Sequence, residues 1–150
     1  MAYRSSRWTR PNFGSDRKEF LLNFGLLVLR VGMGALLLFG HGSDKLVNFS
    51  VKAPTFADPF GVGSSFSLGL AVFAEFFCSL AVALGFATRL AVIPLLILLS
   101  TAAFIIHGGD PWARKELAMV YLVPYLTLLF TGSGRYSLDY LFFGKKHDGI

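Results

Sequence analysis

The chain has 150 residues, of which 54% are hydrophobic and 15% charged, and its formal net charge is +5 at pH 7. Soluble domains are usually about 45–50% apolar and about 25% charged, so this composition indicates a single membrane domain rather than a soluble one. The basic residues stand at the ends of apolar runs, which argues against a nucleic-acid-binding surface, and the one cysteine excludes a disulfide framework or a cysteine-rich metal site within the chain.

Residues 1–19 form a polar, basic segment, and the first apolar run follows at about 20–40. This run is too long for the apolar region of a cleavable signal, so we expect it to be retained as a membrane span. Further runs of spanning length occupy about 65–86 and 90–106. A fourth span at about 111–131 begins at Asp110-Pro111, which reads as a helix cap followed by proline at the first helical position.

The four spans predict an all-α, polytopic membrane four-helix bundle over residues 20–139, followed by a basic tail at 140–150. The second and third spans are joined by about three residues, which predicts an antiparallel hairpin. The longer link at 42–64 is expected on the outer surface.

An even number of spans places both termini on one side of the membrane, and the basic residues predict which side that is. One side holds nine lysines and arginines: Arg4, Arg7, Arg10, Arg17, Lys18, Arg89, Arg135, Lys145 and Lys146. The other side holds four: Lys45, Lys52, Arg114 and Lys115. The positive-inside rule therefore predicts cytoplasmic termini in a bacterial-type inner membrane.

Two charged residues fall near the middle of the predicted spans. Arg30 lies within the first and Glu75 within the second, where Ala71, Cys78 and Ser79 are small neighbours at helical spacing. An unpaired charge at this depth costs about 2.5–3.5 kcal/mol on insertion scales, so we expect Arg30 and Glu75 to form an ion pair. This pair is interpreted either as a structural staple or as part of a ligand site.

Other polar residues are expected to join this pair in the outer half of the bundle. Arg30 and His41 are eleven residues apart, which places them on one helical face about 16 Å apart, and Lys45 follows one turn later. His107 closes the third span and Glu116 lies near the start of the fourth. Tyr121 and Tyr125, one turn apart, extend the lining. Alternatively, the histidines lie at the interface, Lys45 and Glu116 are solvated, and the tyrosines only pack.

With these residues in view, the chain resembles the DoxX family of small four-helix membrane proteins. The resemblance rests on the order and spacing of several short patterns. They are Arg30-x-Gly32-x-Gly34, His41-Gly42-x-x-Lys45, the stretch from Glu75 to Arg89, His107, and Gly132–Asp139. The family implies a redox-linked membrane subunit, associated in some members with quinone reduction or sulfur oxidation. It supplies no catalytic residue.

Three functions remain open at this stage. In a redox complex, the bundle would bind a quinone head group and histidines would relay protons. A partner protein would deliver the electrons, since the sequence indicates no covalently held cofactor and no metal site. In a scaffold, the polar residues would hold the bundle together while it binds a protein partner. In a small-solute or proton pathway, a homo-oligomer would enclose the path. A haem held by His41 and His107 is the least favoured reading.

Overall fold

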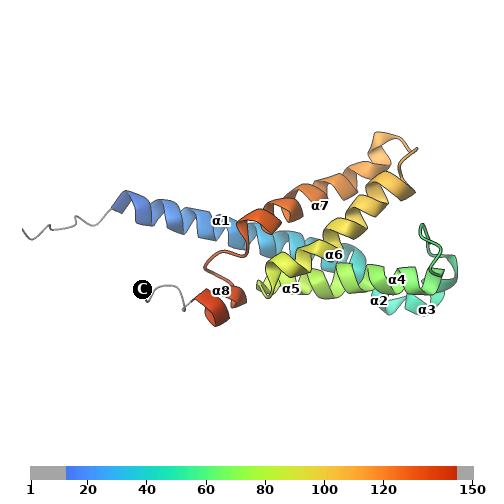
Figure 1. The fold of residues 1–150 in the computed structure, drawn as a ribbon, viewed down its shortest axis with the longest axis horizontal. Coiled ribbons are helices and arrows are strands. Elements are labelled where there is room, and N and C mark those ends of the chain that lie inside the picture. The colour runs from blue at the N-terminus through green and yellow to red at the C-terminus, as the bar shows by residue number, and fades with distance from the viewer. Residues whose placement is uncertain (1–12, 145–150) are drawn as a thin grey trace, which may run out of the picture.

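The computed structural model describes residues 13–144, with side chains from 16 onward, and every regular element in that part of the chain is helical (Figure 1). Three helical stretches are long and apolar enough to cross a membrane: Asp16–Val47, Ser64–Leu84 and Thr88–Ile106. The predicted all-α class is confirmed, with three to four candidate spans. Residues 1–12 and 145–150, which carry part of the predicted charge asymmetry, lie outside the described residues.

The first helix is longer than the sequence predicts. It begins as α1 (Phe13–Leu37), passes through a π-helical segment, η1 (Leu38–Gly42), and continues as α2 (Ser43–Val47). The helix continues past the predicted span of about 20–40, because Gly42 keeps right-handed helical angles and the Ser43 hydroxyl donates to the Leu38 carbonyl, 2.9 Å away. The short helices α3 (Phe49–Lys52) and η2 (Ala53–Thr55) follow.

The second and third stretches form a helical hairpin. The first arm is α4 (Ser64–Val72), η3 (Phe73–Cys78) and α5 (Ser79–Leu84), and the second is α6 (Thr88–Ser100) with η4 (Thr101–Ile106). The reversal uses Gly85, whose φ of 72° is left-handed and suits glycine.

The fourth long helix is α7 (Trp112–Thr131), which packs along α6 and also contacts α1. Its 20 residues span about 30 Å, the thickness of a bilayer core. Arg114, Lys115 and Glu116 near its start make it more polar than the other three. The short helix α8 (Leu138–Phe143) follows and lies beside the reversal of the hairpin (Figure 1).

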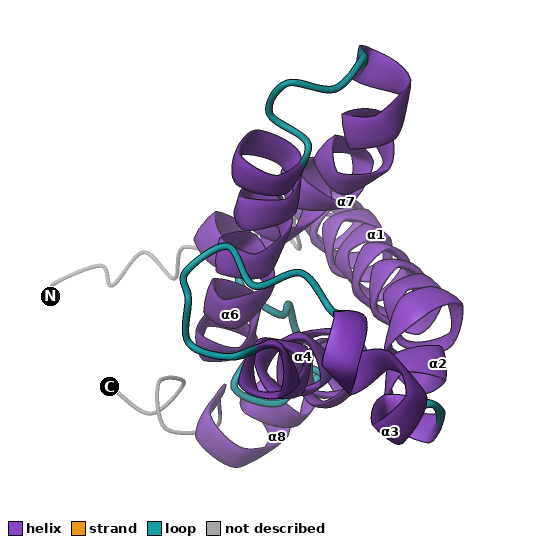
Figure 2. Ribbon diagram, turned by 90° about the vertical axis from the view of Figure 1, so that its right-hand side faces the viewer, coloured by secondary structure: helices purple, strands orange, loops and turns teal. Residues whose placement is uncertain are grey.

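The interior lies where the long helices meet, as the view along the bundle in Figure 2 shows. Val92 and Leu95 of α6 pack there with Leu128 of α7 and Val82 of α5, and all four are fully buried. Outward-facing side chains such as Phe39 and Phe130 are also apolar and about three-quarters exposed, at 75% and 73%. Such an apolar exterior is consistent with contact with a lipid bilayer.

The bundle has two ends that differ in their contents. We call the end that holds residues 85–87 and 132–137 the turn end, and the end that holds residues 56–63 and 107–111 the loop end. At the loop end, the tip formed by η4 and the start of α7 diverges from α4 (Figure 1).

Candidate functional site

A buried ion pair joins two helices towards the loop end of the bundle. Lys45 of α2 donates a hydrogen bond from its ammonium group to the carboxylate of Glu75 in η3, and the two side chains are only 19% and 9% exposed. Oppositely charged groups removed from water are stable only when they meet in this way. The pair therefore fixes α2 against η3.

The close approach of these helices depends on Gly42. A Cβ atom built on Gly42 would lie 2.5 Å from the carbonyl oxygen of Glu75, closer than any real side chain tolerates. Gly34, two turns earlier, is equally close to the facing helix, since a Cβ atom built on it would lie 2.7 Å from the Ser79 carbonyl oxygen and 2.9 Å from the Cβ atom of Ala83. Small residues at helix interfaces permit such backbone contact in membranes.

Tyr121 lies near the ion pair, and His41 lies against Tyr121. The rings of His41 and Tyr121 are 6.1 Å apart in an edge-to-face arrangement, and Tyr121 lies close enough to Glu75 to feel its charge. One turn further along α7, the Tyr125 hydroxyl donates to the Met33 carbonyl, 3.1 Å away. We call His41, Lys45, Glu75 and Tyr121 the Glu75 cluster.

Two members of the cluster lie in π-helical segments, His41 in η1 and Glu75 in η3. A π-helical turn holds an extra residue, which changes the direction of the side chains that follow, and such turns are frequent at functional sites. Nothing in the composition of these segments distinguishes them from α-helix, so sequence reasoning missed them.

Arg30 is not part of this cluster, and the predicted Arg30–Glu75 ion pair is wrong. Arg30 is buried at the turn end, where one guanidinium nitrogen donates to the Tyr136 carbonyl and the charge is attracted by Asp139. Its guanidinium packs against Gly85, ten residues or about 15 Å along the helix from Glu75. The prediction placed both residues at mid-span. The first helix extends further than expected, however, and packs against the second in a register that brings Lys45 rather than Arg30 to Glu75.

Asp139 completes the turn end, and its role was not predicted. Its carboxylate accepts hydrogen bonds from the backbone N–H groups of Ala87 and Thr88, at 2.6 and 3.0 Å, and so caps the start of α6. Its own N–H donates to the Gly85 carbonyl at 2.8 Å. The short pattern ending at Asp139 was the only sequence signal for this contact.

His107 and Glu116, which were expected near Glu75, form no hydrogen bond or ion pair with the cluster in the described part of the chain. The Nδ1 atom of His107 lies 2.8 Å from a carboxylate oxygen of Asp110, which is also 3.5 Å from Arg114. The hydrogen bond with His107, assisted by Arg114, holds the pKa of Asp110 below its usual value. Glu116 is exposed on α7.

The structure thus brings together four of the seven predicted site residues, namely His41, Lys45, Glu75 and Tyr121. They supply a carboxylate, an ammonium group, an imidazole and a phenol, which can donate and accept hydrogen bonds and carry protons. Within residues 16–144, no three His, Cys, Asp or Glu side chains gather closely enough to hold a metal ion.

Comparison with known families gives one match. The family model described as DoxX matches residues 25–108, more than half of the chain and a range that includes Arg30, His41, Lys45, Glu75 and His107. No curated protein and no solved structure shows a significant match to the chain.

Proposed function

Because this chain belongs to the DoxX family of membrane proteins, we propose that it is the membrane subunit of a redox-linked complex and that the Glu75 cluster binds a polar head group such as that of a quinone. The observation that carries this proposal is the buried Lys45–Glu75 ion pair with Tyr121 and His41 beside it. Intramembrane ionisable residues are functional candidates by default, and these lie together.

The residues of the cluster fit the chemistry of quinone reduction. A bound quinone accepts two electrons and two protons, and its two carbonyl oxygens need hydrogen-bond donors. The ammonium group of Lys45 and the hydroxyl of Tyr121 are such donors. Glu75 and His41 can hold and transfer protons, and His41 is only partly buried. Electrons would come from a partner protein.

The test is purification in mild detergent, followed by mass spectrometry of bound proteins and extraction of quinones. We expect an oxidoreductase partner and a quinone with the native chain. We expect Glu75→Gln and Lys45→Met to lose the quinone while keeping the partner. Lys52→Met is the matched control, because Lys52 forms an exposed ion pair with Asp44. Equal quinone retention in all variants contradicts the proposal.

A scaffold function is the second candidate, and one observation favours it. Lys45 and Glu75 satisfy each other's charge, as in buried pairs that only set helix register. A scaffold predicts stable protein partners, no quinone, and loss of those partners when residues 56–63 are altered. If the chain purifies alone and empty, a small-solute or proton pathway through a homo-oligomer becomes the better reading, and changes in flux in Glu75→Gln test it.

We also propose that the turn end faces the cytoplasm of a bacterial-type inner membrane, with both termini on that side. The support is the excess of lysine and arginine in the segments expected there. A fluorescent protein that matures only in the cytoplasm and a phosphatase active only outside it can each be fused to the C-terminus. Fluorescence without phosphatase activity is expected, and the reverse result overturns this orientation.

A further inference from the structure

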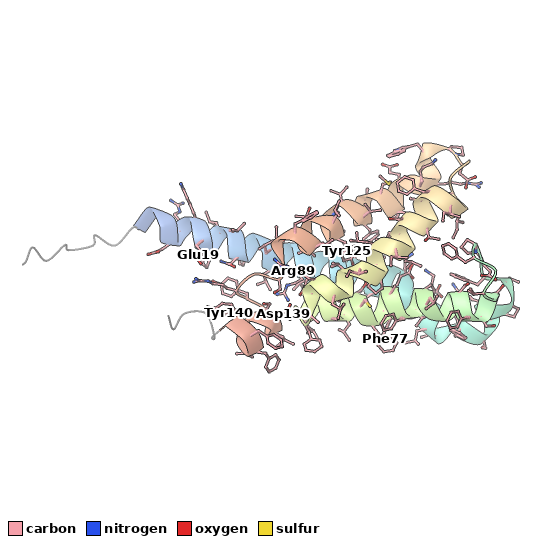
Figure 3. The ribbon with its side chains drawn as sticks, viewed as in Figure 1. Glu19, Phe77, Arg89, Tyr125, Asp139 and Tyr140 are labelled. Atoms are coloured by element: carbon pink, nitrogen blue, oxygen red, sulfur yellow. The ribbon has the colours of Figure 1, made fainter. Side chains whose placement is uncertain are left out.

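A groove of about 700 Å³ opens at the turn end, away from the Glu75 cluster. It lies between the start of α6, the end of α7 and helix α8, and Figure 3 shows Arg89, Asp139 and Tyr140 together in this region. The volume is within the range of small-molecule sites, about 300–1,000 Å³.

The groove presents the positive charge of Arg89. The side chain of Arg89 is exposed and donates to the Phe130 carbonyl at 3.2 Å, and within the described part of the chain it forms no ion pair. Arg135 also lines the groove, and Glu19 lies 2.7 Å from it. The carboxylate of Asp139 is occupied by the two N–H groups at the start of α6 and faces the charge of Arg30. Among the residues that line the groove, two are arginines, Arg89 and Arg135, and one is a carboxylate, Asp139.

A buried hydroxyl adds a second polar feature. Thr88 lines the groove and is fully buried, and its hydroxyl oxygen has no hydrogen-bond partner among the described residues. Because this hydroxyl is closed off from solvent, the accessible phosphate-binding group of the groove is Arg89. The planar guanidinium of Arg89 matches the paired oxygens of a phosphate.

The groove lies at the end of a candidate membrane span and has exposed apolar side chains beside it. Thr88 begins a candidate span, and Leu90 and Phe143 line the groove while being 69% and 70% exposed. An arginine beside exposed apolar side chains at this depth suits a phosphate that is attached to acyl chains. We propose that the groove binds the phosphate head group of an anionic phospholipid.

Native mass spectrometry of the full chain, purified in mild detergent, tests this site. The probes are phosphatidylglycerol and phosphatidylcholine with identical acyl chains. We expect preferential retention of phosphatidylglycerol, reduced about fivefold in Arg89→Gln. Arg89→Lys keeps the charge and is expected to keep most of the preference. Arg114→Gln, at the loop end and 70% exposed, is the matched control and should not change it.

Thermal unfolding of each variant shows whether it folds. If Arg89→Gln does not fold, Arg89→Lys serves as the test variant in its place. Equal retention of both lipids by the native chain overturns the proposal, as does an undiminished preference in a folded Arg89→Gln. A third arm adds excess inorganic phosphate. Displacement of the lipid by phosphate alone assigns the groove to a free anion and overturns the lipid assignment, whereas persistence of the lipid supports it.

Discussion

Gly42 and Glu75 meet backbone to backbone, so that a Cβ atom on Gly42 would stand 2.5 Å from the Glu75 carbonyl oxygen. This contact lies three residues before Lys45 and brings the ammonium group within reach of the carboxylate. The ion pair therefore depends on the close helix contact that Gly42 permits.

Replacement of Gly42 by alanine is expected to separate the two helices. The added methyl group meets backbone atoms that cannot move aside, so we expect a loss of about 1 to 3 kcal/mol in the free energy of unfolding. Unfolding in detergent, followed by circular dichroism, measures it. Gly40→Ala is the control, since nothing lies within 4 Å of its Cβ position. Equal stability of the two variants would show that the contact is looser than the structure has it.

Loss of one charge from the buried pair is expected to be worse than loss of both. Lys45→Met leaves the Glu75 carboxylate buried without a partner, which costs about 3 kcal/mol or more. The double variant Lys45→Met/Glu75→Leu should recover much of that stability. Lys52→Met, which breaks the exposed pair with Asp44, should cost only about 0–1 kcal/mol. The unfolding free energies of the native chain, Lys45→Met, Glu75→Leu and the double variant form a double-mutant cycle, and strict additivity contradicts the buried pair.

Asp139→Ala is expected to destabilise the turn end by more than the about 1 kcal/mol typical of a helix cap. The reason is that Asp139 both caps α6 and faces the buried charge of Arg30. Ser137→Ala, which removes the cap of the short helix α8, is the comparison. Thermal unfolding in detergent measures both, and a smaller loss for Asp139→Ala speaks against its double role.

The loop before α4 is expected to be sensitive to acid. The carboxylate of Asp58 accepts hydrogen bonds from the Ser67 hydroxyl at 2.8 Å and the Gly63 N–H at 2.7 Å, and these bonds lower its pKa. A carboxyl group whose pKa is lowered by folding stabilises the folded chain fully when the pH is above its pKa in the unfolded chain, about 3.9. This stabilisation is lost as the pH falls through its lower pKa in the folded chain.

Asp58→Asn removes the ionised form at every pH and reproduces the acid state. At neutral pH, hydrogen exchange of residues 58–67 should therefore be faster in this variant than in the native chain. Exchange at the distant α6 should be unchanged. Unaltered exchange in the loop would mean that charge on Asp58 does not hold it.

Much of the fold follows from patterns along the chain. Apolar runs of spanning length mark the long helices, and α7 begins at Trp112, one residue later than predicted, because Pro111 takes the cap position that was expected for Asp110. The short link at Ala87 leaves room only for a tight reversal. These features depend on local composition, which a single sequence contains.

The site was harder to predict because it depends on register between helices. Depth counted from the start of an apolar run placed Arg30 and Glu75 at one level, whereas the helices are offset so that Glu75 faces Gly42 and Lys45. Two π-helical turns alter side-chain directions further. The glycines at 34 and 42 could have revealed the register, since each needs a backbone partner on the facing helix.

The contact between Arg30 and the Tyr136 carbonyl joins residues 106 positions apart, and so connects the first helix to a segment made much later on the ribosome. At synthesis rates of about 5–20 residues per second, the guanidinium waits on the order of 5 to 20 s before its acceptor exists. During that interval the guanidinium group lacks the one backbone carbonyl to which it donates in the finished structure. Chains interrupted before residue 136 would lack this acceptor permanently, so the first helix can reach its final environment only when the last turn of the chain has been made.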